Sequence, residues 1–356
     1  MREMDTSSQT KSGLPERYSR QVLFDGIGPA GQRRLMASRV TLIGCGGLGT
    51  MIAETLVRGG VGLVRICDRD FVETSDLQRQ TLFDESDVAA GLPKAEAARI
   101  KLQGINSQVA VEAVVADVNP TNIERVAAKC DLLLDGTDNF ETRYLINDLA
   151  VKRSIPWVYG AVIGATGLCL PIVPGRTPCL RCLFETAPPP EVTPTCDTVG
   201  VLAPAVAVVA ALECVEAFKI LTGNLEELNR RLTSIDVWSG RVVNLNIDAA
   251  GSENDCICCR QRRFEYLEGE SFTTATLLCG RNAVQINRTG GGKIDFAAIA
   301  ARLKPVFAGQ VTYNRFLLKA HADGCDLTLF ADGRAIVRGT DDADRARAIY
   351  AKYIGT

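Results

Sequence analysis

The chain has 356 residues, 46% of them hydrophobic, and a formal net charge of −2. This length allows one large domain or two smaller ones, and the hydrophobic content is sufficient for a packed core. The near-neutral charge provides no general basic surface, which argues against nucleic acid as a partner. The most apolar run, Val199–Leu212, is shorter than the roughly 20 residues that cross a bilayer, so it predicts a buried helix and no membrane association.

The cysteine count and the start of the chain predict a cellular compartment. There are 13 cysteines, a high and odd number for this size. Residues 1–14 are polar and contain no apolar core, so they predict a flexible tail without a secretion signal. We therefore expect the reducing cytoplasm, where cysteines serve as core residues, metal ligands or a nucleophile and not as disulfides.

The first predicted strand is followed by a glycine-rich turn. Val40–Ile43 is β-branched or apolar, as in a buried parallel strand, and follows a short helix predicted at Gly31–Ala37. Gly44, Gly46 and Gly49 then have the G-x-G-x-x-G spacing, which allows a tight turn and a close approach to phosphate. The helix that begins there directs unpaired N–H groups toward an anion.

An acidic residue ends the next predicted strand, Leu63–Cys67. Asp68 follows the last glycine by about 20 residues, the separation at which a carboxylate binds a ribose hydroxyl. Strand, glycines and acid together predict a nucleotide site, without naming the nucleotide.

Strands and helices alternate up to residue 159. Helices are predicted at 93–103, 122–129 and 141–153, and strands at 109–115, 130–135 and 157–159. This alternation predicts an α/β fold with a doubly wound, Rossmann-like parallel sheet. Right-handed crossovers would bring the glycine turn, Asp68, Arg79 and Asp138 to one edge, at the carboxyl ends of the strands.

The pattern changes after residue 160. Strands are predicted within 161–173, at 234–237 and at 242–247, so the sheet is extended by further β-strands, and a buried helix is predicted at 204–221. A proline-rich loop at 187–196 contains Cys196. A thiol on an exposed loop becomes a nucleophile if its pKa is lowered, although the adjacent Asp197 would oppose this, and the residues alone leave the role of Cys196 open.

The C-terminal part has its own pattern. The charged residues 260–272 suggest a linker, and 272–356 a small α+β domain after a main domain at 15–265. Helices are predicted at 296–303 and 342–353, and strands at 275–279, 316–320, 327–330 and 335–337. The only histidine, His321, lies here, and we identify no chemistry in this region.

Two C-x-x-C pairs predict a metal site. Cys179 and Cys182 form one pair, and Cys256 and Cys259 the other. Two such pairs can complete a closed, tetrahedral Cys₄ zinc site, and a closed site is structural. Cys258 does not fit the spacing of either pair.

Charged residues at the predicted sheet edge favour ATP over a nicotinamide. Arg79 and Lys94 are candidates to bind a triphosphate, and Asp138 is a candidate for Mg²⁺, which prefers oxygen ligands. A dehydrogenase needs a proton-transfer group such as histidine, and the chain has none before His321.

With these residues assembled, the chain resembles the ThiF/MoeB/HesA adenylyltransferases, relatives of the ubiquitin-activating enzymes, and most closely the ThiF type. The resemblance runs from about Arg17 to Cys259. The matching motifs are Arg17–Gln21, Gly44–Gly49, Asp68, Leu77–Gln80, Pro93-Lys94, Asp135–Asn139 and both C-x-x-C pairs.

The resemblance implies an activity and a role for each matching residue. Such enzymes use Mg·ATP to adenylate the C-terminal glycine of a ubiquitin-like β-grasp sulfur carrier such as ThiS or MoaD, for thiamine or molybdopterin biosynthesis. The glycine turn, with Gly47, would hold the phosphates and Asp68 the ribose. The remaining family roles fall on Arg79 and Lys94 at the triphosphate, Asp138 at Mg²⁺, and Cys196 as a covalent link to the carrier.

The resemblance also implies partners. Arg20, which by itself is typical of a solvated helix face, matches the arginine that the family supplies across a homodimer interface to the partner's ATP. Sulfur would come from a cysteine desulfurase or another donor.

Two features depart from the family pattern. Asp76 stands where the family usually has asparagine at the nucleotide, and a carboxylate would repel phosphate unless Mg²⁺ or Arg79 intervenes. The tail beyond residue 270 contains no loop that resembles a rhodanese active site.

Two alternatives remain from the sequence. The glycines and Asp68 taken alone fit an NAD-dependent dehydrogenase. Asp76 fits a non-catalytic nucleotide-binding scaffold that has kept the fold and lost turnover.

Overall fold

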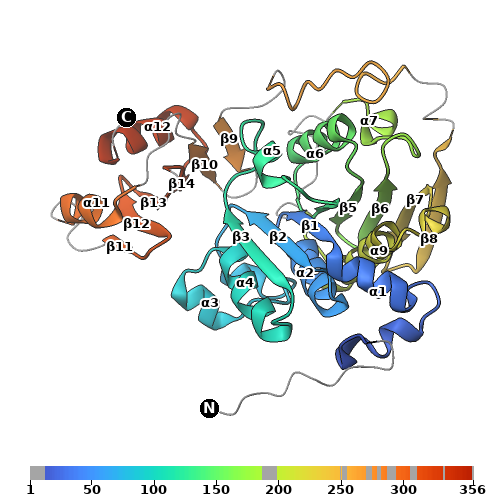
Figure 1. The fold of residues 1–356 in the computed structure, drawn as a ribbon. Helices are drawn as coiled ribbons and strands as arrows, with labels where there is room; N and C mark the ends of the chain where they lie inside the picture. The colour runs from blue at the N-terminus through green and yellow to red at the C-terminus, as the bar shows by residue number, and fades with distance from the viewer. Residues whose placement is uncertain are drawn as a thin grey trace, which may run out of the picture. The chain divides into compact units, whose positions relative to one another are not determined.

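The computed structural model describes residues 13–186, 199–248, 250, 255–269, 275–278, 282–286, 294–304, 311–331 and 333–354. They form two compact units, one built from residues 13–186 and 200–269, the other from residues 275–354 (Figure 1). Among these residues no helix has the length and apolarity to cross a membrane.

The first unit contains an eight-stranded sheet and most of the helices. The strands are β1 (Arg39–Ile43), β2 (Leu63–Asp68), β3 (Ala110–Val115), β4 (Leu132–Asp135), β5 (Trp157–Ile163), β6 (Thr166–Ile172), β7 (Arg231–Asp236) and β8 (Arg241–Asn246). The helices are η1 (Glu16–Tyr18), η2 (Gln21–Leu23), α1 (Gly28–Ala37), α2 (Gly47–Gly59), η3 (Thr74–Asp76), α3 (Glu85–Ala90), α4 (Lys94–Ile105), α5 (Ile123–Val126), α6 (Phe140–Arg153), α7 (Leu180–Leu183), α9 (Ala203–Thr222) and η5 (Leu225–Glu227).

The strand order is β3-β2-β1-β4-β5-β6-β7-β8. The five strands from β3 to β5 are parallel, whereas β6, β7 and β8 continue the sheet as an antiparallel meander. Chain order reverses between β1 and β4, which makes their carboxyl ends the switch point where open α/β sheets bind ligands.

Helices cover both faces of this sheet (Figure 1). Helices α2, α4 and α9 pack on one face, and α5 and α6 on the other. The central strands are apolar on both sides because they are covered twice: all four residues of β4 are buried, as are four of the five in β1. Helix α9 packs against α2 and the strands β4, β5 and β6, which explains why the most apolar run of the chain lies there.

Glycines allow the ends of β1 and β4 to meet. Gly44 has φ of +90°, and a Cβ atom there would lie 2.4 Å from the carbonyl oxygen of Gly136. A Cβ on Gly49 would lie 2.2 Å from the carbonyl oxygen of Gly44. Larger residues at these positions would displace the turn between β1 and α2.

The second unit contains a six-stranded antiparallel sheet. Its strands are β9 (Ala275–Leu278), β10 (Ala283–Ile286), β11 (Val311–Tyr313), β12 (Leu317–Ala322), β13 (Cys325–Phe330) and β14 (Ala335–Arg338), in the order β11-β12-β13-β14-β10-β9. Helices α11 (Phe296–Leu303) and α12 (Ala343–Tyr353) share a separate hydrophobic core with it.

The predicted fold class is confirmed, with differences in detail. Helix α3 and strands β10 and β11 were not predicted, because each is too short to show a clear period. The helix expected at 122–129 is only Ile123–Val126, and Lys129 has φ of +60°. The linker prediction is wrong for residues 260–269: Phe264 and Leu267 are buried, so this segment packs instead of spanning solvent.

Candidate functional site

The glycine turn and helix α2 form one wall of the site. Gly46 is the N-cap of α2, and no side chain among the described residues caps this helix, so the N–H groups of its first turn are available to an anion. A Cβ on Gly47 would lie 3.7 Å from the Cγ atom of Arg79, and a Cβ on Gly46 would lie 4.0 Å from Nε2 of Gln80. The turn therefore lies against the segment that contains the candidate cation Arg79.

Asp68 ends β2 and is attached to the turn. Its Oδ2 accepts the N–H of Cys45 at 2.6 Å, and its Oδ1 accepts the N–H of Asp70 at 2.6 Å. The pKa of Asp68 is raised to about 6, first by burial and then by the charge of Asp70, against the opposing effect of Lys94 and of the two backbone hydrogen bonds. Asp68 thus links the glycine turn to the end of the neighbouring strand.

Asp76 brings the two candidate cations together. It is buried, and its Oδ2 lies 3.3 Å from Nζ of Lys94, whereas its Oδ1 lies 3.5 Å from Nη2 of Arg79. Lys94 is the first residue of α4 and is almost fully buried, although Arg79 retains some exposure. The predicted residues Asp68, Asp76, Arg79 and Lys94 therefore form one cluster beside the glycine turn.

Asp138 lies on the loop after β4 and is exposed. The loop is held by Arg143 of α6, whose Nε donates to Oδ2 of Asp135 at 2.9 Å and whose Nη2 donates to the carbonyl oxygens of Thr137 and Gly160. Burial lowers the pKa of Arg69, just after β2, but the charges of Asp117, Asp70 and, to a smaller extent, Asp138 outweigh it and raise this pKa, so Asp138 lies near the same sheet edge.

Sequence reasoning missed two buried charged residues behind this loop. Arg143 is one of them. A single cation within the otherwise buried part of helix α6 could have indicated it in the sequence. The other is Glu213 of α9, which is fully buried and whose two carboxylate oxygens have no hydrogen-bond partner among the described residues. A Cβ on Gly160 would lie 1.9 Å from Oε1 of Glu213, so only glycine fits opposite this carboxyl group.

Because Glu213 is buried without a partner among the described residues, we expect the stability of the folded protein to depend on pH. Burial raises the pKa of Glu213 well above the usual value, the charge of Asp135 adds to this, and Arg143 opposes it. A carboxyl group with a raised pKa binds its proton more tightly in the folded protein, so folding loses stability as pH rises above the unfolded pKa of roughly 4.3. We expect Glu213→Gln to match the wild type near pH 4 and to gain in relative melting temperature toward pH 8.

The matched control for Glu213→Gln is Glu216→Gln. Glu216 is also buried on α9 but is paired with Lys219 at 2.6 Å. Its replacement removes an ion pair and should show no such gain. A constant difference between wild type and Glu213→Gln across this pH range would mean that Glu213 does not titrate as described.

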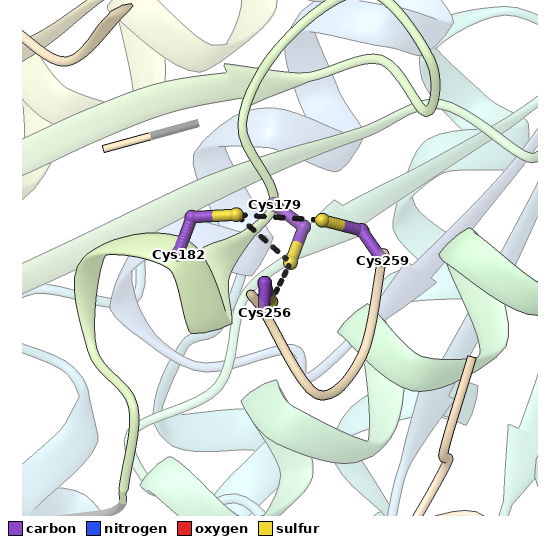
Figure 2. Close-up of side chains that lie close together, drawn as sticks. All are labelled: Cys179, Cys182, Cys256 and Cys259. Carbon is purple, nitrogen blue, oxygen red and sulfur yellow. Dashed lines mark hydrogen bonds between the residues drawn. The ribbon is translucent and has the colours of Figure 1, made fainter. Parts of the chain in front are cut away.

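The four cysteines of the C-x-x-C pairs converge on one point (Figure 2). Their sulfur atoms lie within 4.8 Å of one another, with 3.6 Å between Cys179 and Cys256 and 3.4 Å between Cys182 and Cys259. Four thiolates around zinc, at Zn–S distances of about 2.3 Å, lie about 3.8 Å apart. The donor set and spacing therefore fit a closed tetrahedral metal centre.

Helix α6 supports this cysteine cluster. Asn147 accepts the N–H of Leu180 at 2.9 Å through Oδ1 and donates to the sulfur of Cys258 at 3.3 Å through Nδ2. Asp148 accepts the N–H groups of Tyr266 and Leu267. Cys258 thus contacts a supporting side chain and lies outside the group of four.

Of the remaining predicted residues, only Arg20 is among those that the structure describes. Arg20 is exposed, and no contact between described residues links it to the cluster. Leu23 and Phe24, close to Arg20 in sequence, are 72% and 66% exposed and so place two adjacent large apolar side chains on the surface. Cys196 lies outside the described residues.

Comparisons with known proteins give consistent results. The model of the ThiF family matches residues 18–258. The chain is 46% identical over 341 residues to the sulfur carrier protein ThiS adenylyltransferase of Bacillus subtilis, covering 95% of this chain and 99% of that protein. It is 38% identical to adenylyltransferase and sulfurtransferase MOCS3 of Culex quinquefasciatus, covering 68% of this chain and 55% of that protein.

A structural likeness agrees with the fold. A crystal structure of E. coli MccB with succinimide has a TM-score of 0.60 and 24% identity, covering 68% of this chain and 74% of that one. At this identity the likeness concerns the fold alone.

Proposed function

The chain belongs to the ThiF family, and on this premise we propose that it is an ATP-dependent adenylyltransferase that activates the C-terminal glycine of a ubiquitin-like sulfur carrier. The alignment with the Bacillus subtilis relative covers 95% of this chain and so includes the second unit. This favours a ThiS-type carrier in thiamine biosynthesis over a MoaD-type carrier in molybdopterin biosynthesis.

One observation supports the nucleotide chemistry above the others. The described structure gathers a glycine turn, an uncapped helix start, two cations and Asp68 at the switch point of a parallel sheet. The combination suits a triphosphate better than a nicotinamide dinucleotide, because charge that builds on phosphorus and on the leaving pyrophosphate needs fixed cations nearby.

The proposed reaction uses these groups in order. The glycine turn and α2 would bind phosphate, and Asp68 would accept hydrogen bonds from the ribose. The carboxylate of the carrier attacks the α-phosphorus of ATP, an O–P bond forms, and the bond to pyrophosphate breaks, giving the acyl adenylate. Arg79 and Lys94 would stabilise the charge on the leaving pyrophosphate, and Asp138 would bind Mg²⁺.

We further propose a homodimer and a zinc centre. The exposed Leu23 and Phe24 next to Arg20 fit a subunit interface through which Arg20 reaches the partner's ATP. The four cysteines would hold zinc, which at a closed site stabilises the fold and takes no part in the reaction. The described cysteines are all free thiols, which supports a cytoplasmic enzyme.

The decisive experiment is carrier-dependent exchange of labelled pyrophosphate into ATP. The proposed function predicts exchange that needs both the carrier and Mg²⁺. Binding of ATP without exchange would support the scaffold alternative, and oxidation of NADH would support the dehydrogenase, which the relatives do not favour.

Cys196 provides a separate prediction. If its thiol links covalently to the carrier after adenylation, Cys196→Ser should retain exchange and lose sulfur transfer to the carrier. Transfer is measured by the mass of the carrier after incubation with a cysteine desulfurase as donor. If transfer and exchange both survive, Cys196 is not the linking residue.

A further inference from the structure

Four hydrogen-bond donors contact the Asp76 carboxylate. Oδ1 accepts from Nε2 of Gln80 at 2.7 Å and lies 3.5 Å from Nη2 of Arg79. Oδ2 accepts the N–H of Glu73 at 3.0 Å and lies 3.3 Å from Nζ of Lys94. Asp76 is fixed in place, because the bonds from Glu73 and Gln80 hold both of its oxygens.

The two cations differ in their freedom to leave Asp76. The side chain of Lys94 is 5% exposed and is therefore confined, whereas that of Arg79 is 16% exposed. Arg79 also donates to the carbonyl oxygen of Ser75 at 2.8 Å, and its Cγ atom lies beside Gly47 of the phosphate-binding turn. A rotation of the outer part of the Arg79 side chain would move its guanidinium group from Asp76 to an anion bound at the turn.

We propose that Asp76 is a positioning residue that acts as an exchangeable counter-ion for Arg79: it holds the guanidinium when no nucleotide is bound, competes with the triphosphate for it, and takes it back when pyrophosphate leaves. The inference rests on the proposed function, since it takes a nucleoside triphosphate as the ligand. It also explains how a carboxylate is accommodated at a phosphate site, because Lys94 and Arg79 offset its charge.

The substitution Asp76→Asn separates the Arg79 pair from the other contacts. Gln80 Oε1 is buried and has no hydrogen-bond partner among the described residues, so a flip of the Gln80 amide would let this oxygen accept from the side-chain N–H₂ group that the substitution introduces. The side-chain oxygen that the variant retains at this position would still accept from Glu73 and Lys94. The Arg79 contact would be lost, whereas the Lys94 contact would remain as a hydrogen bond without its ionic attraction.

The test measures binding by calorimetry of Mg·ATP, inorganic tripolyphosphate and adenosine to the full-length wild type and Asp76→Asn. We expect Asp76→Asn to bind Mg·ATP and tripolyphosphate about fivefold more tightly, because a competing partly exposed ion pair has been removed, and adenosine unchanged. Inhibition of exchange by pyrophosphate should strengthen by a similar factor, while the KM for ATP falls and kcat does not rise.

Two controls separate this effect from structural damage. Asp87→Asn is a matched substitution, because Asp87 is also buried, also caps a short helix through its carboxylate and also pairs with a lysine, Lys101. It should leave binding of Mg·ATP unchanged. In an Arg79→Ala background, Asp76→Asn should give no further tightening, as a double-mutant cycle requires for a pairwise effect.

The outcomes are distinct. Equal or weaker binding of tripolyphosphate by a folded Asp76→Asn, or tightening that persists without Arg79, overturns the inference even if exchange is present. Tighter binding by Asp76→Asn in a protein that shows no exchange supports the inference while the proposed function fails.

Discussion

Replacement of Arg79 by alanine is expected to lower carrier-dependent pyrophosphate exchange by about 10²- to 10³-fold. Arg79 lies beside the glycine turn and is held in reach of it by Asp76 and Ser75. Removal of one fixed group that stabilises charge in a transition state has an effect of about this size. The measurement is the rate of label incorporation at saturating carrier and ATP.

The matched control for Arg79→Ala is Arg58→Ala. Arg58 is near the end of α2 and largely exposed, and among the described residues its ion pair is the local one with Glu54, so its loss should leave exchange within a factor of about two. Full exchange by Arg79→Ala would remove this residue from the proposed mechanism.

Mixed subunits extend this prediction to Arg20. If Arg20 acts on the partner's ATP, a dimer of one Arg20→Ala and one Arg79→Ala subunit contains one intact site, so random mixing should restore about one quarter of wild-type exchange from two inactive proteins. No restoration would place Arg20 in the site of its own subunit.

Loss of the cysteine cluster is expected to have the largest effect on stability. We expect about one zinc per chain by elemental analysis, and Cys179→Ser should lower both the zinc content and the free energy of unfolding, the latter by several kcal/mol. Cys179 is buried, and its pair Cys182 contacts Cys259 from a distant part of the chain. Denaturant unfolding before and after chelation measures the same quantity in the wild type.

Cys258→Ser is the matched control for the zinc prediction. Cys258 is fully buried, contacts both Asn147 and Cys179, and is not one of the four cysteines whose sulfur atoms converge. This variant should keep its zinc. A stable, folded wild-type protein without metal would contradict the assignment.

The features of the site that depend on a few neighbouring residues could be predicted from the sequence. The glycine spacing, Asp68 and the C-x-x-C pairs each need only a few neighbouring residues, and the structure brings them together as the pattern indicates. The capping box from Asp84 to Asp87 was also readable and would have revealed α3.

The unpredicted features depend on distant contacts. Nothing near Asp76 in the sequence shows that Lys94 closes over it, or that Arg143 pairs with Asp135 across the start of a helix. Glu213 interrupts an apolar run and suggests an exposed position, yet the sheet buries it against Gly160. Residues 264–267 look like a linker because the groups that bind them, on Asp148, lie far back in the chain.

Helix α6 connects the two sites that have been described separately. Arg143 in its first turn holds the loop of Asp138, and Asn147, four residues later on the same face, holds the segments of the cysteine cluster. A shift of this helix would therefore move both the loop of Asp138 and the segments of the cysteine cluster. By thermodynamic linkage, if metal occupancy changes the affinity for Mg·nucleotide through α6, nucleotide must change the affinity for the metal by the same factor.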